Sequence, residues 1–94
     1  MKRIKIIPVK VECHSGHKAD EYPTCFYLYD KRIDIRQIVD RWYQSDQHPD
    51  FPAADYFKVL TNQNQQFLLK HEWKYNRWLL IVPDDSLYIQ FSYN

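Results

Sequence analysis

Apolar and polar residues alternate along much of this chain, as they do in β-strands that bury one face and expose the other. The alternation is clearest from Leu87 to Tyr93, and shorter apolar runs bounded by turn residues precede it. The predicted strands span residues 4–13, 24–30, 33–43, 56–61, 66–72, 77–82 and 87–93. Because turn signals separate them roughly every ten residues, we predict an all-β fold, a small antiparallel barrel or a strongly bent sheet of about six to seven strands.

The segment 33–43 is the most apolar long stretch, and its pattern fits two structures. Four of its side chains follow the i, i+3, i+4, i+7 spacing of one helix face: Ile35, Ile38, Val39 and Trp42. A short helix near residues 36–43 is therefore one alternative. Its β-branched residues favour a strand instead, with a one-residue bulge near Arg36 or Gln37. We prefer the bulged strand, whose core face would be Ile33, Ile35, Ile38 and Trp42.

The connections between the predicted strands are of two kinds. The polar stretches 14–23 and 44–55 contain the only Gly and three of the five Pro, and their composition predicts long loops. Residues 30–31 and 62–64 are short enough for hairpin turns. In the first strand the apolar alternation changes phase just before Pro8, which predicts a bulge or bend at an edge or corner of the sheet.

Composition limits the number of domains and the make-up of the core. A chain of 94 residues has room for one hydrophobic core, so residues 1–94 are predicted to form a single β domain. Aromatic residues make up 17% of the chain and Gly occurs once. We therefore expect an aromatic core, and turns that rely on Asn, Asp and Pro.

Charge and hydropathy exclude several classes of protein. Lys and Arg number 13 against 12 Asp and Glu, and no basic run is present, so the footprint of a strong phosphate binder is missing. The longest apolar run, Trp78 to Val82, is far shorter than a membrane helix needs, so no membrane partner is predicted. The first residues lack the continuous apolar region of a signal peptide, and we expect a cytoplasmic protein with reduced thiols.

Few residues offer catalytic or metal chemistry. Cys13, His17 and Cys25 supply ligand types that zinc accepts, but the usual paired spacing is missing and both Cys fall on apolar strand positions. We predict two core thiols, with a zinc site as the weaker alternative, and no cofactor. The chain has no nucleophile elbow, glycine-rich phosphate loop or metalloprotease motif, so we do not predict an enzyme.

Two kinds of binding protein fit the sequence. A protein-interaction module needs an exposed anchor, which Phe51 in the 44–55 loop would supply unless it folds back onto the core. A single-stranded nucleic-acid-binding domain would instead use Arg and Tyr side chains on a sheet face. The residues available for that face are Arg32, Arg36, Arg41, Tyr27, Tyr29 and Tyr43. We predict a binding module with an unknown protein partner, and nucleic acid as the alternative partner.

Three short motifs resemble a group of short, uncharacterised bacterial proteins. The motifs are GHKADEYP at residues 16–23, IVDRW at 38–42 and YFKV at 56–59, and they follow one another as in that group. The resemblance covers roughly residues 11–80. It implies a cytoplasmic protein, and it assigns no activity, cofactor or catalytic residue.

The first two motifs single out four charged residues that are not obvious core residues: Lys18, Glu21, Asp40 and Arg41. In a structural interpretation, Glu21 and Lys18 fix the loop, while Asp40 pairs with Arg41. In a functional interpretation, the loop and the strand end meet and form one small binding site. We therefore take these four residues, together with Phe51, as the predicted binding residues.

Overall fold

The computed structural model describes residues 4–14, 21–45 and 52–83, which form six β-strands and no helix. The strands are β1 (Ile4–His14), β2 (Tyr22–Leu28), β3 (Lys31–Gln44), β4 (Ala54–Thr61), β5 (Gln66–Glu72) and β6 (Arg77–Pro83). Each strand pairs antiparallel with the next, and β1 pairs with β6, which closes the sheet into a barrel. The predicted all-β barrel is confirmed. The last predicted strand, 87–93, lies outside the described residues.

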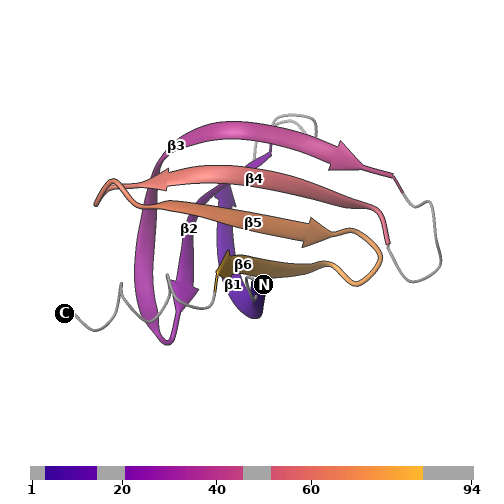
Figure 1. Ribbon diagram of the computed structural model, residues 1–94, viewed down its shortest axis with the longest axis horizontal. Helices are drawn as coiled ribbons and strands as arrows, with labels where there is room; N and C mark the ends of the chain where they lie inside the picture. The colour runs from indigo at the N-terminus through magenta and orange to yellow at the C-terminus, as the bar shows by residue number, and fades with distance from the viewer. Residues whose placement is uncertain (1–3, 15–20, 46–51, 84–94) are drawn as a thin grey trace.

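Two long strands turn the corners of this barrel. Residues 4–9 of β1 pair with β6 and residues 10–14 pair with β2, while β3 pairs first with β2 and then with β4. In Figure 1, β3 rises steeply beside β2 and then bends to run along β4. Pro8 lies just before β1 changes partner, which agrees with the predicted corner, although the register shift comes later, between Glu12 and Cys13.

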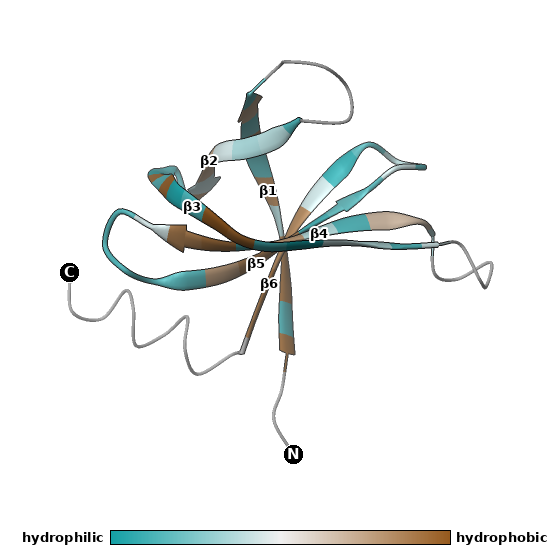
Figure 2. Cartoon of the chain, turned by 90° about the horizontal axis from the view of Figure 1, so that it is seen from above, coloured by the Kyte–Doolittle hydropathy of each residue, from teal (hydrophilic) through white to brown (hydrophobic). Residues whose placement is uncertain are grey.

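The core lies where the inward faces of these strands meet. It contains three Phe and five aliphatic side chains: Phe26, Leu28, Phe57, Val59, Phe67, Leu69, Leu80 and Val82. Aliphatic side chains therefore outnumber rings, and the expectation of an aromatic core is too simple. Figure 2 shows that the hairpin loops at the rim are mostly hydrophilic, so polar residues border the open ends.

The segment 33–43 is strand throughout, so the helix alternative near 36–43 is wrong. Its register against β4 skips one residue between Ile35 and Gln37, which confirms the bulge predicted near Arg36. A second register shift follows between Ile38 and Asp40, and the sequence pattern did not predict it. Each bulge moves all later side chains to the other face of the strand. The second bulge therefore places every side chain after Val39 on the face opposite to the one predicted with a single bulge.

Trp42 was predicted to lie in the core, and the second bulge makes this prediction wrong. Trp42 lies opposite Tyr56 on the outer face of the barrel, where their rings stack with centroids 5.3 Å apart, and it is 42% exposed. Its neighbour Arg41 lies opposite the buried Phe57 instead. The other predicted core residues, Ile33, Ile35 and Ile38, do pack against the core.

Several strand ends also differ from the predicted ones. The second strand starts at Tyr22 and ends at Leu28, so the hairpin turn falls on Tyr29 and Asp30, both with positive φ. Two successive positive φ values fit the tight hairpin turn whose twist matches the strands, even without a Gly. Both predicted long loops are also too long. Strands β1 and β2 take in the ends of the loop 14–23, and β3 and β4 take in the ends of the loop 44–55.

The outward orientation of Trp42 predicts a small effect of its removal. We expect Leu80→Ala, at a fully buried site, to lower the free energy of unfolding by about 2–5 kcal/mol. Trp42→Ala loses only a stacked surface ring and should cost about 0.5–1.5 kcal/mol. Urea unfolding of both variants measures this difference. Equal losses would contradict the second bulge.

The turn between β2 and β3 predicts a stabilising substitution. Asp30 has a φ of 65°, a value that costs energy for residues with a Cβ atom. We expect Asp30→Gly to raise the free energy of unfolding by about 0.5–1 kcal/mol. Lys58→Gly, at an exposed strand position, is the control and should lower it. A loss of stability in Asp30→Gly would contradict the turn geometry.

Candidate ligand-binding pocket

A pocket of about 290 Å³ opens at the end of the barrel where β5 turns into β6. Four of its lining residues carry rings: Phe57, His71, Trp73 and Trp78. Three more carry charges, namely Glu21, Arg41 and Asp55, and the thiol of Cys13 and the amide of Asn76 complete the lining. The volume is close to the lower limit of the usual range for small-molecule sites, so a ligand of one or two rings is the size that fits.

Arg41 is held in this pocket by three partners. Its Nη1 donates a hydrogen bond to the backbone oxygen of Glu21 at 3.0 Å, and its Nη2 lies 3.8 Å from Oδ2 of Asp55. The guanidinium also lies over the ring of Phe57, 4.7 Å from the centroid. Asp55 is only 8% exposed, so this charge needs a partner, and Arg41 supplies it.

His71 contacts both Trp rings of the pocket, and Phe57 contacts Trp78 directly with centroids 5.5 Å apart. Its imidazole stacks on Trp78 with centroids 4.6 Å apart, and Trp73 lies at 5.9 Å on a tilted plane. Nε2 of His71 lies 3.0 Å from Oδ1 of Asn76. An amide oxygen only accepts, so Nε2 carries the proton, and in the neutral ring Nδ1 is left as an acceptor.

Cys13 is the thiol of the pocket, and it is a poor nucleophile. Burial raises its pKa to about 11, and the charges of Glu21 and Cys25 add to this rise. Cys25 itself is fully buried, and the two thiols are free. Among the described residues no cluster of His, Cys, Asp and Glu is suited to a metal ion. The predicted zinc alternative also needs His17, which lies outside those residues.

Two of the predicted binding residues come together here, as the functional interpretation of the motifs requires. Glu21 and Arg41 are joined by a hydrogen bond and both line the pocket. Asp40 points to the other face of β3, and its Oδ1 accepts a hydrogen bond from the backbone N–H of Arg41 at 2.8 Å. Lys18 and Phe51 lie outside the described residues.

Apart from Cys13, the other pocket residues are not among the candidates that the sequence indicated, although two of them carry a signal. Asp55 continues the buried alternation of β4, in which Phe57, Val59 and Thr61 face the interior. His71 takes the next alternate position of β5 after the buried Phe67 and Leu69, although it is only half-buried. A polar residue at the end of an otherwise apolar inward face indicates that the core ends there and that a binding site can begin.

Comparison of the chain with known protein families, with curated proteins and with solved structures finds no match. The likeness of the three motifs to short bacterial proteins therefore stays a prediction. No helix within the described residues is long and apolar enough to cross a membrane. Function has to be inferred from the geometry of the pocket and of the outer surface.

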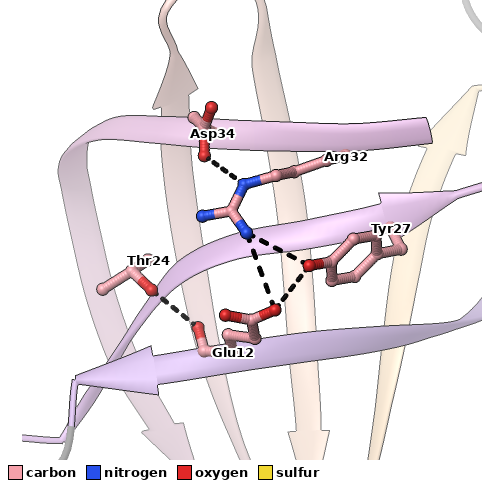
Figure 3. Close-up of polar contacts among 5 residues, drawn as sticks. All are labelled: Glu12, Thr24, Tyr27, Arg32 and Asp34. Carbon is pink, nitrogen blue, oxygen red and sulfur yellow. Dashed lines mark hydrogen bonds and ion pairs between the residues drawn. The ribbon is translucent and has the colours of Figure 1, made fainter.

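The outer surface of β1, β2 and β3 carries a polar cluster centred on Arg32 (Figure 3). Nε of Arg32 donates to Oδ1 of Asp34 at 2.9 Å, and Nη1 donates to the hydroxyl of Tyr27 at 3.1 Å. That hydroxyl donates to the carboxylate of Glu12, which lies 3.7 Å from Arg32. The bond to Asp34 raises the pKa of Arg32, and the bond to Glu12 raises the pKa of Tyr27.

This cluster bears on the predicted nucleic-acid face. The charge of Arg32 is balanced by two carboxylates, whereas Arg41 lies in the pocket beside Asp55. The two cations therefore do not share a surface on which a phosphate chain would meet both. Nucleic-acid binding by a common Arg and Tyr face receives no support from this placement.

The raised pKa of Cys13 predicts slow alkylation. At about pH 8 we expect iodoacetamide to react with the folded protein about a hundredfold more slowly than with a thiol of ordinary pKa, because only the thiolate reacts. Mass spectrometry over time measures the rate. In denaturant both Cys13 and Cys25 should react fast, which is the control, and fast modification of the folded protein would contradict the burial of Cys13.

Proposed function

We propose that this protein is a small β-barrel binding module that takes its ligand in the end pocket. The observation that carries the proposal is the placement of Arg41. Its guanidinium is held by a backbone oxygen, a carboxylate and a ring, so its orientation is set before a ligand arrives. Preorganised charged groups in an otherwise ring-lined hollow are typical of ligand sites.

The convergence of the chain on the pocket supports the same proposal. β1, β3, β4, β5 and β6 each contribute a lining residue, and Glu21 comes from the segment before β2. If this end of the barrel had only a structural role, apolar side chains would fill it with less loss of stability, because a buried carboxylate is costly to desolvate. The presence of Asp55 and Arg41 at this end of the barrel therefore favours a role in recognition.

Binding is proposed in preference to catalysis for a chemical reason. The pKa of Cys13 at about 11 keeps this thiol protonated at neutral pH. His71 holds Asn76 with one nitrogen and stacks on Trp78. The described lining thus offers hydrogen-bonding groups and flat surfaces without an activated nucleophile.

Nuclear magnetic resonance of the ¹⁵N-labelled protein tests the proposal with a set of small planar one-ring and two-ring compounds. We expect some of them to shift the indole N–H signals of Trp73 and Trp78, while the signal of Trp42 on the outer face stays in place. Shifts that are as large at Trp42, or no shifts at millimolar concentration, would overturn the proposal.

A matched pair of variants on β3 sharpens this test. Arg41→Met removes the guanidinium from the pocket, whereas Arg36→Met removes an exposed one at the first bulge. We expect ligand affinity to fall about tenfold or more in Arg41→Met, the loss of a charged hydrogen-bond donor, and to stay unchanged in Arg36→Met. Equal affinities of the two variants would contradict a role for Arg41.

A further inference from the structure

The pocket sets a hydrogen-bond donor beside an acceptor. Nη2 of Arg41 and Oδ2 of Asp55 are 3.8 Å apart, which is longer than a hydrogen bond. A guanidinium has several N–H donors, and within the part of the chain that the structure describes Nη1 of Arg41 donates to the backbone oxygen of Glu21. Both side chains line the hollow. A ligand that carries an acceptor next to a donor can therefore bridge the pair.

The charges of this pair disfavour an ionic ligand. An anion that approached Arg41 would also meet Asp55, and a cation that approached Asp55 would also meet Arg41. Like charges brought together in a partly desolvated site repel strongly, so both kinds of ion lose much of what they gain. A neutral ligand with its own adjacent donor and acceptor satisfies both side chains and leaves the pair balanced. The third charged lining residue, Glu21, is exposed, so solvent screens its carboxylate.

The remaining walls select for a flat molecule. Phe57, His71, Trp73 and Trp78 line the same pocket as the pair, and Trp73 is 57% exposed, so its ring surface is open to a ligand. Planar heterocycles stack on such rings at little conformational cost. The volume of about 290 Å³ limits the ligand to one or two rings.

We propose that the pocket recognises a planar heterocycle by a cyclic amide edge, in which a carbonyl oxygen lies beside a ring N–H, as in uracil and guanine. This inference rests on the proposed function and names its ligand class. The carbonyl oxygen accepts from Arg41, the ring N–H donates to Asp55, and the ring stacks on the aromatic wall.

Calorimetry with two pairs of nucleosides tests this edge. Uridine and guanosine carry the carbonyl beside the ring N–H, whereas 3-methyluridine and 1-methylguanosine keep the ring and lose that N–H. We expect the methylated partner of each pair to bind about tenfold to a hundredfold more weakly, because it leaves the carboxylate of Asp55 without its donor. Equal affinity within both pairs would overturn recognition of the edge.

One-ring compounds that carry a charge test the expectation that the pocket prefers a neutral ligand. Benzoate and benzylammonium should each bind more weakly than uridine, and tighter binding of either ion would overturn the proposal of a neutral ligand. These experiments distinguish failure of the proposed ligand class from failure of the proposed binding function. If rings bind without regard to the N–H, the pocket is still a binding site, whereas if no ring binds at all, both proposals fall.

Variants of the pair test each side chain. In Asp55→Ala, which leaves no side-chain acceptor for the ring N–H, the preference for uridine over 3-methyluridine should fall toward one, a ratio that lower stability alone does not change. Arg41→Met tests the donor side and should weaken both nucleosides equally, because both keep the carbonyl. An unchanged preference in Asp55→Ala, or unchanged affinities in Arg41→Met, would count against the bridge.

The same edge is available from a free nucleoside and from a base within a single strand. A short oligouridylate separates the two sources. If a strand is the source, the oligouridylate binds more tightly than uridine and the gain falls as salt is raised, because phosphate contacts release counterions. Equal affinity at all salt concentrations identifies the free heterocycle.

Discussion

The second bulge of β3 is the constraint on which the pocket depends. With the first bulge alone, the face that carries Ile38 would continue through Asp40 and Trp42, and Arg41 would point to solvent. The extra residue at Val39 shifts the register against β4 and sets Arg41 opposite Phe57. The ion pair with Asp55 and the hydrogen bond to the backbone of Glu21 then become possible.

The bulges also serve the closure of the barrel. β3 pairs with β2 through its first residues and with β4 through the rest, so it has to bend between two layers of strands (Figure 1). Bulges increase the local twist and bend of a strand, and both of them lie at this transition. The same backbone irregularity thus completes the fold and orients the cation of the pocket.

The interior of the barrel divides into a dry part and a polar part. In the middle, Phe and aliphatic side chains fill the space, with Val59, Leu69 and Leu80 fully buried. Toward the end where β5 meets β6, the same inward faces carry Asp55, His71 and Trp78. Polar groups are tolerated there because the open end lets them meet partners and solvent, whereas the middle offers neither. The pocket is therefore the part of the barrel interior where polar and aromatic side chains replace the apolar core.

Much of this structure follows from the sequence alone. Apolar alternation located all six described strands, the clustering of β-branched residues favoured a strand over a helix at 33–43, and the phase of its apolar residues indicated the first bulge. The strands and the first bulge are predictable because they come from short segments whose side chains report directly on burial. For the site, only the functional one of the two interpretations of the motifs brought the segments of Glu21 and Arg41 together.

Only the tertiary structure decided which face Arg41 and Trp42 occupy, and which residues join them. A bulge adds one residue to a strand, and after it the same alternating pattern fits either face equally well. The choice between those faces is made by the partner strand, whose register brings Phe57 to Arg41 and Tyr56 to Trp42. The roles of Asp55 and His71 are also decided by the tertiary structure, because their chemistry depends on neighbours that lie far away along the chain.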